Sequence, residues 1–188
     1  MKFIDFYRSI INEKAPSQKD LPFTIFNTEI AKGTIITDYG AVENRVYFIN
    51  TGIIELAIKN DTSEKILDFF FPNEPVTCLT SFLLQIPSDT KMTALTDCEV
   101  EYFEHHEIYS NYPSSIEVNK LGRILVEHAY MRKAKREKEF LSKTAEELYL
   151  QLIEEHSQYI QQLPVNKLAK YLGIQPESLS RIRKKITS

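Results

Sequence analysis

The sequence predicts an α+β fold, in which a jelly-roll-like antiparallel β-roll is joined by a long helix to a small helical domain. Three observations predict it. Short β-branched and aromatic runs alternate with turn-forming residues from Leu21 to Phe103, as in all-β sandwiches and barrels. The stretch from Ser115 to Leu141 contains no Gly or Pro except Gly122, which favours one long helix. Two short amphipathic segments joined through Gly173 follow.

The first 14 residues predict an amphipathic helix, because their apolar side chains recur at helical spacing. This stripe consists of Phe3, Phe6, Tyr7, Ile10 and Ile11. The expected strands are the runs FTIF, TIIT, RVYFI, IIELAI, KILDFFF, MTAL and CEVEYF. Strands this short and this closely spaced indicate a closed antiparallel architecture rather than an open parallel sheet. A short helix is expected next, ending before Pro113.

Charge is divided unevenly along the chain, whose net charge is −3. Residues 1–119 contain 9 Lys and Arg against 18 Asp and Glu, whereas residues 120–188 contain 14 against 8. A polyanion would be repelled by the first part and attracted to the second. No apolar run approaches the length of a membrane span, and the N-terminus lacks a signal-peptide cleavage pattern. We therefore expect a cytoplasmic protein without a membrane partner.

The long helix has the pattern of a helix–helix seam. Its apolar positions step by 3, 4 and 3 residues and comprise Val118, Leu121, Leu125 and His128. This spacing predicts that residues 114–141 form a dimerisation helix and that the protein is a homodimer. Packing of the same seam against the chain's own β domain is the alternative. Residues 140–144 are the expected hinge, and Thr144 and Glu147 have the spacing of a capping box that opens the next helix.

The segment PVNKLAKYLGIQPESLSRIRKKI, residues 164–186, predicts a helix-turn-helix. Its first helix has one apolar face, formed by Val165, Leu168, Ala169 and Leu172. Gly173 can then turn the chain with a positive φ, and Pro176 suits the first position of a second helix. That second helix gathers Leu179, Ile182 and Ile186 on one side. The opposite side is polar and basic, which suits entry into a DNA major groove.

The candidate DNA-binding residues lie on and next to that polar side. They are Gln175, Glu177, Ser178, Arg181, Lys184 and Lys185. Arg can fork onto guanine and Glu can accept a hydrogen bond from cytosine, whereas Lys and Ser suit phosphate. We therefore expect double-stranded DNA as the partner. The alternative is a β-roll signalling or interaction module whose terminal helical hairpin binds a protein instead.

With these motifs the chain resembles the Crp/Fnr family of bacterial transcription regulators, over nearly its whole length. The resemblance implies a cyclic-nucleotide-binding-like β-roll in residues 1–113, a dimerisation helix and hinge in 114–141, and a DNA-binding helix-turn-helix in 142–188. It also implies that Glu177 and Arg181 read base edges and that Ser178 contacts phosphate. The family often has Arg where this chain has Pro176, so we expect a different operator. Because Ser188 follows the second helix directly, a shortened or absent β-wing is also expected.

The resemblance extends to the turns of the β-roll but not to its nucleotide anchors. Gly33, Gly40 and Gly52 match the family's turn positions. Cyclic-nucleotide binders hold the phosphate with a Gly-Glu helix and an Arg, and residues 72–95 contain neither. We therefore expect an unknown effector, with no cofactor and no cyclic AMP. The residues that could line its pocket are Thr77, Thr80 and Lys91. RNA polymerase is a further expected partner if the protein is an activator.

No other motif indicates catalysis or metal binding. Cys78 and Cys98 are too few for an iron–sulfur cluster and are expected to be half-buried in strands. The histidines have no second ligand at metal-binding spacing; they are His105, His106, His128 and His156. Since phosphate-binding Gly loops, nucleophile elbows and HExxH motifs are also missing, we expect neither an enzyme nor a metal protein.

Overall fold

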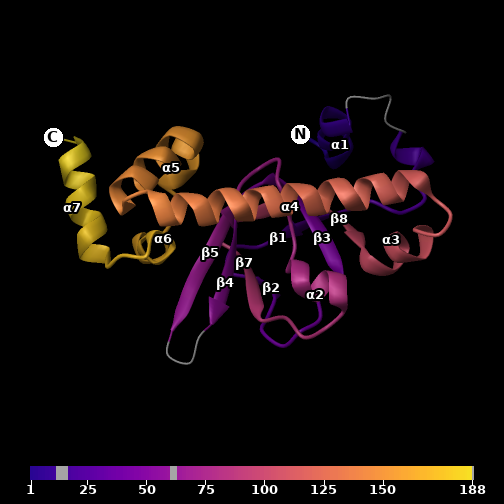
Figure 1. The fold of residues 1–188 in the computed structure, drawn as a ribbon, viewed down its shortest axis with the longest axis horizontal. Coiled ribbons are helices and arrows are strands. Elements are labelled where there is room, and N and C mark those ends of the chain that lie inside the picture. Colours follow the sequence, from indigo (N-terminus) through magenta and orange to yellow (C-terminus); the bar gives the residue numbers. More distant parts are fainter. Residues whose placement is uncertain (12–16, 60–62, 188) are drawn as a thin grey trace.

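The computed structural model describes residues 1–11, 17–59 and 63–187, and it has the predicted α+β fold. The strands are β1 (Phe26–Ile30), β2 (Ile35–Thr37), β3 (Arg45–Thr51), β4 (Ile54–Lys59), β5 (Glu64–Phe70), β6 (Pro75–Val76), β7 (Thr90–Ala94) and β8 (Cys98–Glu104). The α-helices are α1 (Phe3–Ile11), α2 (Leu79–Leu84), α3 (His105–Asn111), α4 (Ile116–Ser142), α5 (Ala145–Ile160), α6 (Val165–Leu172) and α7 (Pro176–Thr187). Figure 1 shows α4 running along the whole β-roll.

The β-roll consists of two antiparallel sheets, with strand orders β1-β8-β3-β6 and β2-β7-β4-β5. Alternate residues of both sheets point inward and form the roll-interior cluster, which includes Tyr47, Ile49, Ile54, Phe70, Val76, Met92 and Val100. Gly52 makes the turn from β3 to β4 with φ +95°, and a Cβ there would lie 2.5 Å from the Asp97 carbonyl oxygen. Only glycine therefore fits this turn, which holds the two sheets together.

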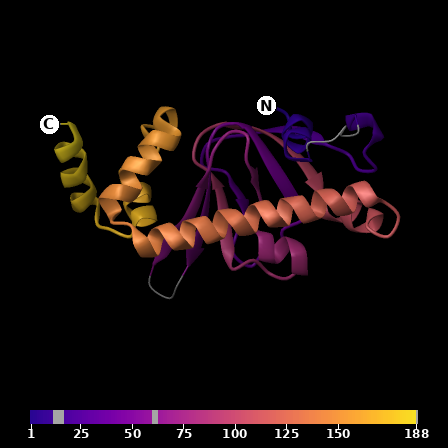
Figure 2. The same ribbon diagram turned by 45° about the horizontal axis from the view of Figure 1, so that its top comes forward.

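The outer face of the first sheet is covered by α1, α3 and the beginning of α4, all at one end of the molecule (Figure 2). Their helix-covered cluster includes Phe3, Phe6, Tyr7, Phe48, Phe103, Ile108, Val118 and Leu121. The Phe3 N–H at the start of α1 donates to Glu101 Oε2 at 2.6 Å. Because Glu101 is buried on β8, this bond fixes the start of α1 to the sheet.

Several local predictions differ from the structure. The first strand begins at Phe26, where FTIF was expected to end, and both β6 and α2 were not predicted. Cys98 lies in β8 as expected, but Cys78 directly precedes α2, and both thiols are fully buried rather than half-buried. The predicted capping box is confirmed, because the Thr144 hydroxyl accepts from the Glu147 N–H and the Glu147 carboxylate accepts from the Thr144 N–H.

The three C-terminal helices lie at the opposite end of α4 from α1 (Figure 1). Their apolar side chains share one core with the outer face of the second sheet. This shared cluster includes Ile53, Phe69 and Phe71 of the roll and Leu148, Leu152, Leu168, Ala169, Leu172 and Leu179 of the helices. The helices are therefore docked on the β-roll and not connected to it through α4 alone.

Candidate nucleic-acid interface and effector groove

The turn between α6 and α7 has the predicted geometry. Gly173 adopts φ +71° and its N–H donates to the carbonyls at the end of α6. The Ile174 N–H donates to the Ala169 carbonyl at 3.0 Å, which completes a Schellman-type helix end. The Gln175 carbonyl then accepts from the Ser178 and Leu179 N–H groups at the start of α7. These local hydrogen bonds fix the sharp turn between the two short helices.

The second helix has one buried and one exposed side. Leu179 is 0% exposed and belongs to the shared cluster. Five of the six predicted DNA-binding residues are exposed, and the sixth, Ser178, is half-buried. The exposed ones are Gln175, Glu177, Arg181, Lys184 and Lys185. In Figure 1, α7 forms the outermost element at its end of the molecule.

Two basic residues of α7 are engaged within the helical domain. The Lys185 ammonium pairs with Glu146 of α5 at 2.7 Å. The Arg183 Nε donates to the Tyr149 hydroxyl at 3.1 Å. Arg183 was not among the predicted residues, and its side chain points back toward α5. Arg181 and Lys184 are both exposed on the solvent side of α7.

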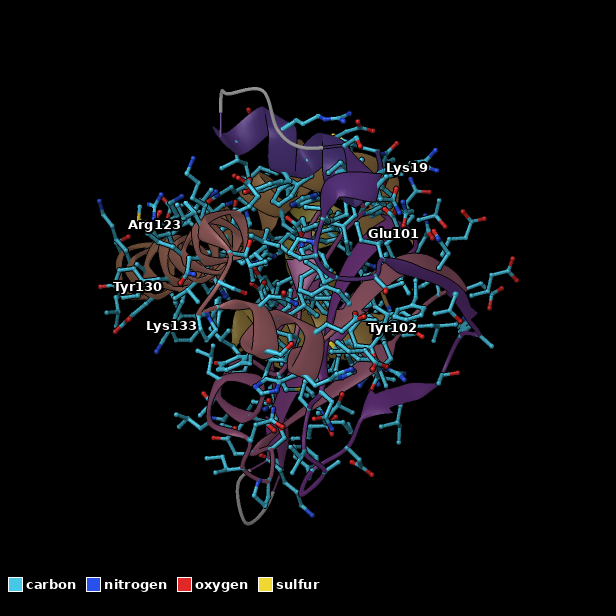
Figure 3. The ribbon with its side chains drawn as sticks, turned by 90° about the vertical axis from the view of Figure 1, so that its right-hand side faces the viewer. Lys19, Glu101, Tyr102, Arg123, Tyr130 and Lys133 are labelled. Atoms are coloured by element: carbon cyan, nitrogen blue, oxygen red, sulfur yellow. The ribbon has the colours of Figure 1, made fainter. Side chains whose placement is uncertain are left out.

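The predicted dimer seam on α4 packs inside the chain. Val118 and Leu121 are 0% and 1% exposed in the helix-covered cluster, and the His128 ring lies 5.7 Å from the Phe6 ring. The assignment of this seam to a dimer contact is therefore wrong, since a 3-4 spacing does not specify which partner covers it. Figure 3 shows Arg123 and Tyr130 on the opposite side of α4, turned away from the strands.

A groove of about 1490 Å³ lies between α4 and the β-roll. Thr77 and Thr80 line it, as predicted for an effector pocket. Lys91 does not line it. On β7, Lys91 precedes the inward-pointing Met92, so its side chain lies on the outer face of the sheet, where the ammonium pairs with Glu64. Because side chains alternate between the two faces of a strand, the one cation that the sequence predicted for a phosphate lies outside the groove.

Among the residues that the structure describes, no three His, Cys, Asp or Glu side chains gather closely enough to hold a metal ion. None of the helices described has the length and apolar character needed to span a bilayer. The candidate sites are thus the exposed side of α7 and the groove beneath α4.

Comparison with known proteins identifies the fold. Residues 27–111 match the cyclic nucleotide-binding domain family. No curated protein sequence matches the chain significantly. The structure of FixK2 from Bradyrhizobium japonicum is similar with a TM-score of 0.74 and 14% identity, covering 87% of this chain and 85% of that one. The chain has the Crp/Fnr fold.

Two further solved structures are similar to this chain. The c-di-GMP-responsive global regulator CLP of Xanthomonas campestris aligns with a TM-score of 0.67 and 13% identity over 87% of this chain and 86% of its own. A proposed transcriptional regulator of the Crp/Fnr family from Eubacterium rectale aligns with a TM-score of 0.66 and 16% identity, over 87% and 79% of the two chains. CLP and the Eubacterium rectale protein are both described as regulators.

Within its Crp/Fnr fold, the chain docks α6 onto the second sheet through a buried ion pair. The Lys167 ammonium lies 2.5 Å from Glu55 Oε1 and 3.5 Å from Glu64 Oε1. Glu55 is 1% exposed, so its charge depends on Lys167 for compensation. Its second oxygen and the cross-strand Thr93 hydroxyl have no hydrogen-bond partner among the described residues. Lys167 was not among the residues singled out from the sequence.

Arg132 of α4 ties the same end of the roll together. Its guanidinium donates to Asp68 Oδ2 at 2.6 Å, to Glu74 Oε1 at 2.7 Å and to the Phe69 carbonyl at 2.6 Å. Burial alone would lower the pKa of Arg132, but the two carboxylates outweigh it and raise this pKa. Each of the three nitrogens donates one hydrogen bond and the charge is paired with two carboxylates, so Arg132 is a poor candidate to hold a phosphate.

One turn later, Arg136 connects α4 to α6. It donates to the Tyr171 carbonyl at 2.5 Å, and its guanidinium lies 3.7 Å from the Tyr171 ring centroid. On α5, the His156 ring stacks on Phe71 of the roll at 3.8 Å. Burial lowers the pKa of His156, so the stacked ring is favoured in its neutral form. Polar and aromatic contacts thus surround the shared cluster on both sides.

Proposed function

We propose that this protein is a sequence-specific DNA-binding transcription regulator that acts as a homodimer. The observation that carries the proposal is the exposed polar side of α7, opposite the buried Leu179, on a helix-turn-helix with a defined Gly173 turn. The Crp/Fnr fold supports it, because two of the structurally similar proteins are described as regulators. RNA polymerase is a further partner if control is positive.

Each residue on this side has a proposed role. Glu177 and Arg181 would read base edges, because carboxylate and guanidinium groups match the hydrogen-bonding patterns of cytosine and guanine. Ser178 and Lys184 would contact phosphates, with Gln175 at the start of the helix. Lys185 would exchange Glu146 for a phosphate on binding, since the free protein pairs the two.

Arg181→Ala should weaken specific binding by about 1 to 3 kcal/mol and relax base choice at one position per half-site. Lys184→Ala should weaken binding to all DNA sequences alike, and it should lower the slope of log affinity against log salt concentration by about one unit. Operators selected from a random duplex pool and scrambled duplexes would be titrated by fluorescence anisotropy at several salt concentrations. If Arg181→Ala lowered the affinity for both duplexes equally, Arg181 would contact only phosphate and would not read a base.

The same titrations separate DNA binding from the protein-binding alternative. Neutralising phosphates releases counterions, so affinity for DNA should fall steeply as salt rises. If the protein binds no duplex from the random pool, the proposed function is contradicted. A partner whose affinity hardly responds to salt would then favour the hairpin as a protein-binding element.

The homodimer is proposed to form through the outward side of α4. Ile116, Val126 and Tyr130 are 78%, 39% and 68% exposed there, and with Asn119 and Arg123 they recur at steps of 3 and 4 residues. This spacing is typical of a lengthwise helix contact. Two parallel copies would present two α7 helices to half-sites about 34 Å apart.

Replacing both Val126 and Tyr130 by Asp should convert the dimer to a monomer, because four carboxylates would meet in the apolar contact. Sedimentation equilibrium at micromolar concentration would measure the change. Lys138→Glu is the control, since Lys138 is exposed on α4 away from these residues and should leave the dimer intact. A natural protein that sediments as a monomer, or a double variant that stays dimeric, would contradict this interface.

A further inference from the structure

The groove beneath α4 is the place where the three hydrophobic clusters meet. At its α3 end it is lined by Ile108 of the helix-covered cluster, and in its middle by Val76 of the roll-interior cluster. At its other end it is lined by Ala169 of the shared cluster and by Ile174 in the helix-turn-helix turn. A single occupant of the groove would therefore contact both the β-roll and the C-terminal helices.

The walls favour an apolar occupant. Most of the side chains along the roll and α4 are aliphatic or aromatic, including Leu56, Phe70, Phe82, Leu121 and Leu125. Apolar surface removed from water contributes about 25 cal/mol per Å². The nearby cation Arg132 is already paired with the carboxylates of Asp68 and Glu74. A doubly charged or highly polar ligand would thus lose hydration in the body of the groove without gaining compensating bonds.

The end near the helix-turn-helix is different, because two exposed ammonium groups lie at its edge. Lys133 of α4 and Lys170 of α6 both line the groove, and neither has an ion pair with any described residue. The bond from Arg136 to the Tyr171 carbonyl brings these two helices together. Figure 3 shows Lys133 pointing outward from α4. One anionic group could therefore bind at this end and remain partly hydrated.

We propose that the groove binds an amphipathic small molecule with an extended apolar body and one anionic head group, carboxylate or phosphate, placed at Lys133 and Lys170. The apolar body lies against α4 and the roll, and the head group reaches the helix-turn-helix. Binding itself does not depend on the DNA-binding proposal. Only the role of such a molecule as the effector rests on that proposed function.

Calorimetry with dodecanoate, dodecyl phosphate and dodecanol, each below its micelle concentration, would test this proposal. Both anions should bind, and the neutral alcohol should bind about tenfold more weakly because it has no ion pairs to form. The anion that binds more tightly identifies the preferred head group as carboxylate or phosphate. Cyclic AMP should neither bind nor compete, since it has little apolar body and no free anchor.

Variants assign the binding to the groove. Replacing Lys133 and Lys170 together by Gln should weaken the binding of both anions about tenfold and leave the affinity for dodecanol unchanged. The control Lys138→Gln should leave all three affinities unchanged. Ala129→Trp fills the groove and should abolish binding of all three, with circular dichroism checking the fold. Equal binding of anions and alcohol, or binding that survives Ala129→Trp, would overturn the proposal. Because the ligands are measured without DNA, failure here is distinct from failure to bind an operator.

Discussion

Lys167→Met is expected to lower the free energy of unfolding by about 3 kcal/mol, the lower end for breaking a buried ion pair. The loss arises because Glu55, 1% exposed, would be left buried with no cation beside it. The lower end applies since Lys167 retains some solvent exposure. Urea unfolding would measure the change, and hydrogen exchange would show it as faster opening of β4 and α6.

The second half of this test is a double-mutant cycle. Glu55→Met combined with Lys167→Met should recover most of the lost stability, because an apolar pair of similar volume avoids the desolvation of both charges. Lys170→Met is the matched control on the same helix, and it should be nearly neutral, since Lys170 is exposed. A single variant as stable as the natural protein would mean that Glu55 is hydrated and that the ion pair does not hold α6.

Arg132→Met is expected to cost about 3 to 5 kcal/mol, because it leaves two carboxylates and a carbonyl without their donor. Asp68, Glu74 and the Phe69 carbonyl all bond to this one guanidinium. Arg132→Lys should recover only part of the loss, since an ammonium cannot match the planar fork. Urea unfolding of the natural protein, Arg132→Met and Arg132→Lys would rank their free energies of unfolding.

Arg8→Met supplies the comparison for Arg132. Arg8 pairs with Asp5 at 3.4 Å on the exposed side of α1, with 45% and 52% of the two side chains accessible. Exposed pairs of this kind are worth about 0.3 to 0.5 kcal/mol. If the two arginine variants lost similar stability, the three-way clamp would be no stronger than a surface pair.

The helix-turn-helix could be predicted because its signals are local. Gly173 and Pro176 define the turn within a few residues, and Leu168 and Leu179 follow from the helical spacing around them. The capping box at Thr144 is equally local. Strand content was predictable from β-branched residues, but β6 is two residues long and carries too little pattern to be recognised.

What could not be predicted depends on contacts between distant residues. The partner of Lys167 lies 112 residues away, so sequence spacing contains no trace of it. The side to which Lys91 points depends on the register of β7, which the resemblance alone did not give. Similarly, Val118 and Leu121 have the spacing of a helix seam whether the covering surface is a second copy or the chain's own roll.

The shared cluster limits how this protein could exchange parts with others of its fold. Phe69 and Phe71 of the roll and Leu152 and Leu168 of the helices bury one another. C-terminal helices taken from another protein of this fold would have to bring a complementary apolar face, together with a cation at the position of Lys167. Recombination at the α4–α5 junction would otherwise leave both halves with exposed hydrophobic surface, so the β-roll and the C-terminal helices must diversify together.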